Sequence, residues 1–174
     1  PTMVIRYGNT HDATMLAEFG SKAFHDSFAK DNTEENIRLY LKQTYSPQIQ
    51  LGELTNPEVV FLIAEIEDET VGYVKINLTN KDDSVKGIKT IEIERIYAAK
   101  EHIGEGVGKS LMQASIQEAK QRGCDSLWLG VWEKNPRAIE FYKKWGFVEV
   151  GTHVFMLGDD PQRDYIMELM VESI

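Results

Sequence analysis

Three glycines alternate with other residues just ahead of a segment that has helical spacing. The run reads Ile103-Gly104-Glu105-Gly106-Val107-Gly108-Lys109, and Ser110 follows it. Glycines let the backbone turn tightly and bring N–H groups against a ligand, and a helix N-terminus adds a partial positive charge. The run therefore predicts a turn suited to phosphate. It fits neither the dinucleotide fingerprint nor the P-loop, and a plain strand-to-helix turn could have the same sequence.

A second run, over residues 127–147, joins an apolar strand pattern to an aromatic helix. Successive turns of this helix carry Asn135, Ala138, Phe141 and Tyr142, and Gly146 and Phe147 follow at its end. A glycine in that position is typical of a helix C-terminus.

Together the two runs resemble the GCN5-related N-acetyltransferase (GNAT) superfamily. Its acetyl-CoA motif, Gln/Arg-x-x-Gly-x-Gly/Ala after a central strand, is matched at 103–108, except that Ile103 stands at the Gln/Arg position. Its second motif, Asn-x-x-Ala-x-x-Phe-Tyr-x-x-x-Gly-Phe, is matched without exception at 135–147. Ile103 removes a side chain but no backbone donor. The resemblance implies an acetyl-CoA-dependent N-acetyltransferase of α/β class, with a mixed sheet of about seven strands flanked by helices.

The resemblance also implies how acetyl-CoA would bind. Backbone N–H groups of residues 103–108 would hold the pyrophosphate, and the main chain of Ile96 and Tyr97 would bond the pantetheine arm in a gap between two parallel strands. Asn135 would bond the far end of the arm. The full set of expected cofactor-binding residues is Ile96, Tyr97, Ile103, Gly104, Glu105, Gly106, Val107, Gly108, Lys109, Ser110, Asn135, Arg137, Ala138, Phe141, Tyr142 and Lys144.

Acetyl transfer to an amine needs a base, because a primary amine with a reference pKa of about 10.4 is almost fully protonated at neutral pH. Glu92 and Glu94 lie on one face of an expected strand by period-two alternation, and either could act through a water, Glu94 being preferred. The alternative is that Glu92 is merely exposed and Glu94 pairs with Arg95 or a neighbour. Tyr142 would protonate the leaving thiolate, unless it only packs in the core. A strand N–H near Ile96 could meet the oxyanion.

Further segments resemble the PaiA-type branch, bacterial enzymes of this superfamily that acetylate polyamines such as spermidine and spermine. They are Phe24–Phe28, Asn32–Thr33, Tyr40–Leu41, Ile93–Tyr97, Met156–Asp160 and Asp164–Met167. We therefore expect a small cationic amine as acceptor, with Asp26, Tyr40, Asp159, Asp160 and Tyr165 as substrate-binding candidates. Other small amines, protein lysines and peptide N-termini are the alternatives, and a non-catalytic acyl-CoA sensor is a third, prompted by Ile103.

Charge is unevenly spread along the chain, which carries a formal net charge of −9. Residues 11–70 hold 12 acids against 4 bases, residues 71–148 hold 10 against 13, and residues 149–174 hold 6 against 1. Acidic ends disfavour a nucleic-acid partner, and a basic middle could meet an anionic cofactor. Acidity that merely keeps the protein in solution is the simpler explanation.

Periodicity and turn residues predict the elements that position these side chains within one domain over 1–174. Expected strands are 3–7, a hairpin over 59–77, 90–97, 126–132, 147–155 and 165–171. Expected helices are one capped at Asn9 and Thr10, one begun by an Asn32–Glu35 capping box, a short one from Ser46-Pro47, and those over 106–122 and 136–145.

Composition excludes several classes of protein. The 174 residues are 42% hydrophobic, which suits a packed globular domain, and no run is long enough for a membrane span or has the form of a signal peptide. Cys124 is the only cysteine and the four histidines are scattered, so we expect no metal. A reducing, cytoplasmic location follows, and a homodimer is an option that the superfamily often uses.

Overall fold

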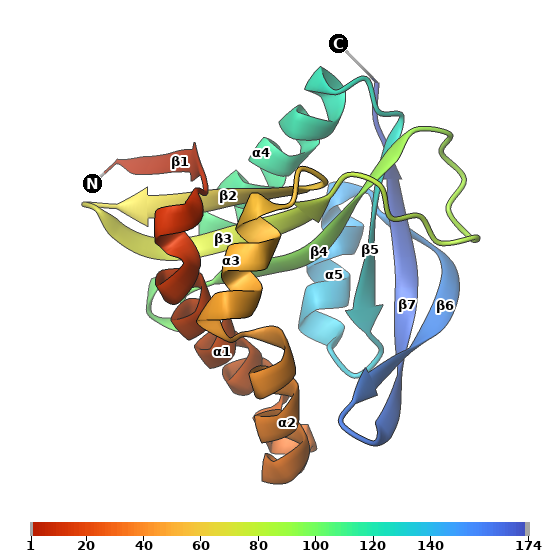
Figure 1. The fold of residues 1–174 in the computed structure, drawn as a ribbon. Helices are drawn as coiled ribbons and strands as arrows, with labels where there is room; N and C mark the ends of the chain where they lie inside the picture. The colour runs from red at the N-terminus through yellow and green to blue at the C-terminus, as the bar shows by residue number, and fades with distance from the viewer. Residues whose placement is uncertain (1, 173–174) are drawn as a thin grey trace.

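A mixed seven-stranded sheet forms the centre of the computed structural model, which describes residues 2–172 (Figure 1). The strand order is β1-β2-β3-β4-β5-β7-β6, with β4 and β5 parallel and all other neighbours antiparallel. The strands are β1 Met3–Tyr7, β2 Val59–Ile66, β3 Glu69–Asn77, β4 Thr90–Ala98, β5 Ser126–Trp132, β6 Val148–Leu157 and β7 Asp160–Met170. The expected fold class and strand number are confirmed.

Helices cover both faces of this sheet. α1 (Ala13–Phe28), α2 (Glu34–Thr44) and α3 (Pro47–Thr55) lie in front of it in Figure 1, and α4 (Val107–Gln121) and α5 (Pro136–Trp145) lie behind. Within the described chain, no helix is long and apolar enough to cross a membrane.

Local sequence signals set most helix starts. Ser46 caps α3 by accepting from the Ile49 N–H, with Pro47 in its first turn, as expected. The Asn32–Glu35 box is wrong, because the Thr33 hydroxyl caps α2. Asn32 instead donates from its side-chain amide to the Phe28 carbonyl and accepts a bond from Gln162, 130 residues away. That long-range partner is not visible in a local pattern.

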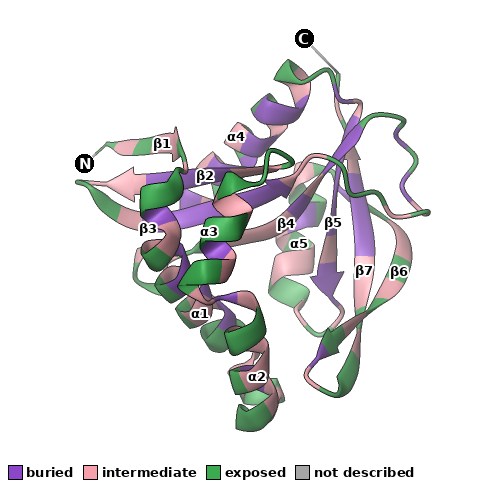
Figure 2. Cartoon of the chain, viewed as in Figure 1, coloured by how far each residue is buried: buried purple, intermediate pink, exposed green. Residues whose placement is uncertain are grey.

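The larger core lies between the sheet and the helices α4 and α5, where the central strands are buried (Figure 2). Gly72 on β3 allows this packing, because a Cβ there would lie 2.6 Å from the Tyr97 carbonyl oxygen and 2.7 Å from Val107 Cγ1. Two smaller clusters lie on the other face, under α1, α2 and α3. One is rich in aromatic side chains from α1, α2 and β6.

β4 and β5 stay together only at their starts. Their register pairs end at Glu92↔Trp128, although both strands continue. Just beyond, β4 carries a bulge at Glu94, because Lys75 and Ile76 of β3 pair with Arg95 and Ile93. A bulge bends the strand that contains it. The sheet therefore opens between the carboxyl ends of its two parallel strands.

Candidate active site

The glycine run forms the turn into α4. Gly104 and Gly106 have positive φ angles of 89° and 81°, and a Cβ on either would meet nothing within 4 Å. Backbone conformation, not space, therefore requires glycine at both positions. Gly106 is the helix N-cap and offers no side chain, so the first-turn N–H groups of α4 are left for a ligand.

This arrangement narrows the expected set of backbone donors. The N–H groups of Ile103 and Glu105 already donate to the carbonyls of Lys100 and His102. The backbone N–H groups that remain free to bind an anion are those of Gly104, Gly106 and the first helical turn, which includes Val107, Gly108 and Lys109. Ser110, half-buried, begins the next turn of hydrogen bonds by donating its N–H to the Gly106 carbonyl.

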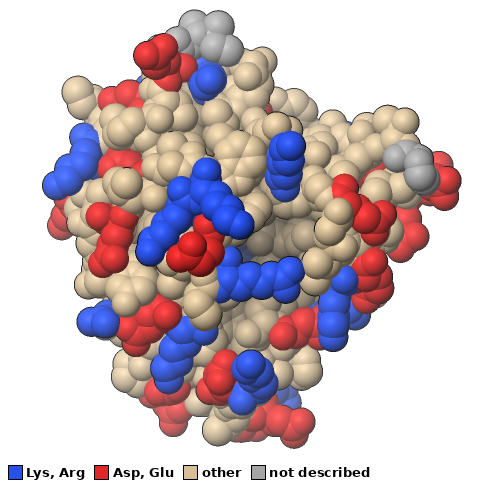
Figure 3. Space-filling model, turned by 180° about the vertical axis from the view of Figure 1, so that it is seen from behind, with Lys and Arg blue, Asp and Glu red and all other residues tan. Residues whose placement is uncertain are grey.

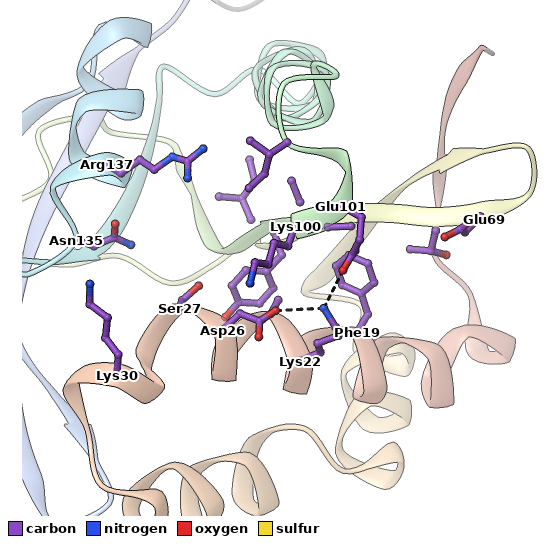
Figure 4. A pocket seen from close by; sticks show the side chains of 17 residues that line it. Phe19, Lys22, Asp26, Ser27, Lys30, Glu69, Lys100, Glu101, Asn135 and Arg137 are labelled. Carbon is purple, nitrogen blue, oxygen red and sulfur yellow. Dashed lines mark hydrogen bonds and ion pairs between the residues drawn. The ribbon is translucent and has the colours of Figure 1, made fainter.

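A cleft of about 660 Å³ opens where β4 ends. It is lined by α1, by residues 96–99, and by Ile103, Asn135 and Arg137. Figure 4 shows Asn135 and Arg137 at the start of α5 facing Ser27 of α1 and Lys30 of the turn that follows α1 across the cleft. Seen from the side of α4 and α5, Lys and Arg side chains surround a hollow in the surface (Figure 3). Such a setting suits an anionic ligand.

The start of α5 is built around Asn135. Its side-chain oxygen accepts from the Ala138 N–H at 3.2 Å, so its amide NH₂ stays free to donate into the cleft. Ala138 and Phe141 pack on the core behind, and the Phe141 ring would touch a Cβ at Gly108 at 3.5 Å. Lys144 is exposed near the other end of α5, roughly 10 Å from Arg137, so the structure does not bring it to this cleft.

Tyr142 belongs to the main core and has no hydrogen-bond partner among the described residues. Burial raises its pKa well above the ordinary value for a phenol. The hydroxyl therefore keeps its proton at any physiological pH, which a proton donor requires.

The two candidate bases differ sharply in their partners. Glu94 Oε2 lies 2.7 Å from Lys75 Nζ, which in turn lies 3.0 Å from Glu53 Oε1 on α3. Arg95 pairs with the same Glu53. From sequence, the alternative to a base was that Glu94 pairs with Arg95 or a neighbour. The structure shows that pairing, and the partner is Lys75 of β3.

Glu92 has no cationic partner within ion-pair distance among the described residues. It accepts a hydrogen bond from the Asn80 side chain at 2.9 Å, and burial together with the nearby Glu94 charge raises its pKa to about 7. It lies at the last register pair before β4 and β5 part. Glu92 is therefore better placed than Glu94 to exchange a proton near neutral pH.

The substrate-binding candidates do not all meet. Tyr40 stacks on Phe24 in the aromatic cluster under α1 and α2, whereas Asp26 lines the cleft at the end of β4 and pairs with Lys22. Asp159 is exposed in the β6–β7 turn, and the neighbouring Asp160 accepts a bond from Gln162.

The structure places Tyr165 apart from Tyr40, the other tyrosine expected to bind substrate. Tyr165 is the register partner of Val131, which packs in the main core, and Tyr165 packs against that core too. Side chains along β7 alternate between the two faces of the sheet, and Tyr165 is on the face that α4 and α5 cover. Tyr40 lies over the opposite face. The residue that β7 turns toward Tyr40 is Asp164.

Sequence reasoning missed the contact between Asp164 and His153. His153 Nε2 lies 3.4 Å from Asp164 Oδ2, and His153 Nδ1 lies 3.9 Å from Asp82 Oδ2. Burial raises the pKa of Asp164 to about 6. The signal was hairpin register, since His153 and Asp164 pair across β6 and β7.

Over residues 2–172, no three His, Cys, Asp or Glu side chains are grouped to hold a metal ion. Cys124 is buried as expected, and this burial raises the pKa of its thiol. It therefore lacks the thiolate character of a nucleophile.

Comparisons with known proteins agree with this geometry. A model of the Acetyltransferase (GNAT) family matches residues 22–147. An uncharacterized N-acetyltransferase of Lactobacillus delbrueckii subsp. lactis is 33% identical over 147 residues, 84% of this chain and 85% of that one. A spermidine N(1)-acetyltransferase of Thermoplasma acidophilum is 25% identical over 174 residues, 97% of this chain and 98% of that one.

The fold has a close counterpart among solved structures. The PaiA N-acetyltransferase of Thermoplasma acidophilum, in complex with coenzyme A, superposes with a TM-score of 0.80 at 22% identity, covering 98% of this chain and 100% of that one. The resemblances read from the sequence are thereby confirmed. Because the family model matches most of the chain, including the glycine turn and the start of α5, the protein belongs to the acetyltransferase (GNAT) family and is an acetyl-CoA-dependent N-acetyltransferase.

Proposed function

We propose that the protein moves acetyl from acetyl-CoA directly to a primary amine of spermidine or spermine, with both substrates bound at once. The observation that carries the proposal is the position of Glu92. Its carboxyl, with a pKa of about 7, lies at the apex of the opening between β4 and β5. A base with that pKa is half ionised at neutral pH and can still accept a proton.

The donor side is supplied by backbone and by α5. The N–H groups of Gly104, Gly106 and the first turn of α4 would hold the phosphates of acetyl-CoA. Arg137 and the free amide of Asn135 would hold the remainder of the acetyl-CoA molecule in the cleft. When bound, acetyl-CoA supplies a thioester whose carbonyl an amine can attack.

The protein moves two protons in this proposal. Glu92 would accept one from the substrate ammonium, directly or through a water, which leaves the neutral amine that attacks the thioester carbonyl. The buried Tyr142 hydroxyl would donate one to the departing thiolate, and the second proton that the nitrogen loses on becoming an amide would restore that hydroxyl. β4 has no β5 partner beyond Glu92, so main-chain N–H groups near Ile96 are available to the oxyanion.

A polyamine is the best-supported acceptor. The similarity to a spermidine N(1)-acetyltransferase is one support. The other is chemical, because the face that holds Glu92 also holds Asp82 and Asp164. Within the described chain, His153 is the only basic side chain within ion-pair distance of either aspartate. Several carboxylates can attract an acceptor that keeps positive charge at nitrogens that do not react.

An acetylation screen tests the proposal. Purified protein with acetyl-CoA is offered spermidine, spermine, monoamines, amino acids, aminoglycosides and peptide N-termini, and thiol release is followed while both substrates are varied. We expect the highest kcat/KM for a polyamine and intersecting lines. Parallel lines would exclude direct transfer, and a clear preference for peptides or monoamines would exclude the polyamine.

A further inference from the structure

An aromatic–carboxylate site lies on the front face of the sheet, formed by Asp164 with the rings of Phe28, Tyr40, Trp132 and Phe155. We infer that this site binds an ammonium group of the acceptor that does not react, while Glu92 serves the one that does. The inference rests on the proposed polyamine acceptor and names the residue that would select it.

One oxygen of Asp164 lacks any partner. The side chain is only 13% exposed, Oδ2 faces His153 at 3.4 Å, and Oδ1 is fully buried with no hydrogen bond in the described chain. A buried acceptor without a donor costs free energy. A cationic N–H group that bonded Oδ1 would remove this cost, so the orphaned oxygen points to a cationic ligand.

Aromatic rings lie on the same face of the sheet as this carboxylate. Trp132 is its register partner on β5, and the ring centroids of Trp132 and Phe28 lie 4.9 Å apart. Tyr40 and Phe155 meet edge to face at 5.5 Å, and the Asp164 charge contributes to raising the pKa of Tyr40. Ring faces attract cations, more strongly where water is excluded. A carboxylate among rings is therefore an environment for an alkylammonium, whose methylene stem the rings can also cover.

The site and Glu92 share one face of the sheet. Asn80 bonds Glu92, and Asp82, two residues later, approaches the His153 that meets Asp164. The β5 register partners of Glu92 and Asp164 are Trp128 and Trp132, four residues or roughly 13 Å apart along the strand. An extended acceptor with nitrogens at both ends can engage both carboxylates. A short monoamine can reach only one.

His153 leaves the site open to a ligand. Its side chain is 37% exposed, and it lies between the carboxylates of Asp164 and Asp82. A ligand from solvent therefore reaches Asp164 by passing His153, which is not packed in the core. An incoming ammonium could take the place of the His153 imidazole.

The test is a comparison of acceptors in the Asp164→Asn variant. We expect KM for spermidine to rise roughly 10- to 100-fold, as for loss of one charged hydrogen bond, with kcat changed by less than about twofold. KM for n-butylamine should not move. Glu149→Gln is the matched control, because Glu149 is an exposed acid on the opposite face of the same strand pair. It should leave both constants unchanged.

The outcomes separate this inference from the proposed function. If the wild type acetylates spermidine and Asp164→Asn does so with the same KM, the site is refuted while the polyamine function stands. An equal rise for butylamine also refutes it, since that indicates a purely structural role. A wild type that does not acetylate spermidine at all refutes both.

A second measurement needs no variant and covers the case in which Asp164→Asn does not fold. Protonated N,N-dimethylbutylamine carries one N–H but, as a tertiary amine, cannot be converted to an amide, and 2-methylhexane is its neutral counterpart of nearly the same shape. We expect the cation to inhibit spermidine acetylation competitively in the wild type and the neutral compound to inhibit at least about tenfold more weakly. Equal inhibition by the two would overturn the inference.

Discussion

Burial of Glu92 helps its proposed chemistry at the expense of stability. Its pKa is about 7 in the folded protein against an ordinary value of 4.5. Between these values the folded state binds more protons than the unfolded state, so the free energy of unfolding falls as pH rises. The protein is therefore less stable at pH 8 than at pH 5 on account of this one group, and Asp164, with a pKa of about 6, acts in the same direction.

Replacement of Glu92 by Gln should separate the two effects. Gln keeps an oxygen for the Asn80 amide but cannot take a proton. We expect kcat to fall on the order of 100-fold, and the rise of wild-type kcat/KM through about pH 7 to disappear. Thermal unfolding should show the variant gaining stability over the wild type at pH 8 but not at pH 5.

The Tyr142→Phe variant should change the pH profile differently from Glu92→Gln. It removes the proposed donor and not the base, so kcat should fall while the acidic limb of the pH profile stays where it is. A wild-type limb that persists unchanged in Glu92→Gln would remove Glu92 as the base, and the neighbouring Glu94 would then need testing.

Single residues also show how far sequence alone reaches. Alternation placed Glu92 and Glu94 on one strand face, and the sequence-based preference was for Glu94, whereas the structure favours Glu92. Their difference comes from Lys75 on another strand and Glu53 on a helix, which are neighbours only in the folded chain. Asp164 and His153 were missed for the same reason, since a β-hairpin register joins them.

Among the elements, the turn into α4 gives a sharp comparison of two glycines. Gly106→Ala keeps open space around the new Cβ but forces alanine to a φ of 81°, which costs roughly 1–2 kcal/mol. We expect a Tm lower by several degrees and a raised KM for acetyl-CoA, because the strained turn would no longer aim its N–H groups.

Gly108→Ala is the control two residues away. Its φ is not positive, and the new Cβ would make ordinary contact with Phe141 at 3.5 Å. Alanine favours the helix by roughly 1 kcal/mol over glycine, so Tm should stay or rise and KM should change little. Equal damage from the two substitutions would mean that the positive φ of Gly106 is not what requires glycine in this turn.

Elements with local signals were predicted well, and those shaped by distant contacts were not. β1, β5 and α5 have the predicted bounds. β7 was expected from Tyr165 but begins at Asp160, because its first residues are polar and have no apolar alternation to mark them. The bulge in β4 left no sequence signal either, since it depends on pairing with β3.

At the scale of the whole molecule, the distribution of charge along the chain is consistent with acetyl-CoA and with the proposed cationic acceptor. The basic middle of the chain supplies Lys100 and Arg137 to the cleft, where Asp26 also lies, paired with Lys22. The acidic C-terminal part of the chain supplies Asp159, Asp160 and Asp164. Attraction between such charges extends over a Debye length of about 8 Å at physiological salt and is weakened by added salt. A polycationic acceptor should therefore be more sensitive to salt than a singly charged one.

We expect KM for spermidine to rise several-fold when salt is raised from about 50 to 300 mM, while KM for n-butylamine stays nearly constant. Steady-state kinetics at fixed, saturating acetyl-CoA measures both, and the acetyl-CoA constant is followed separately because its phosphates also feel salt. Equal responses of the two amines would remove the electrostatic support for a polyamine.

The strand order has a consequence for how the protein is made. The last strand along the chain, β7, lies between β5 and β6, so β5 has a bare edge and β6 has no sheet neighbour until β7 has left the ribosome. Exposed strand edges invite pairing with other chains. The glycine turn and α5 can be in place before then, whereas Asp164 arrives with the strand that closes the sheet. The newborn chain thus passes through an aggregation-prone stage that ends only when its acceptor side is complete.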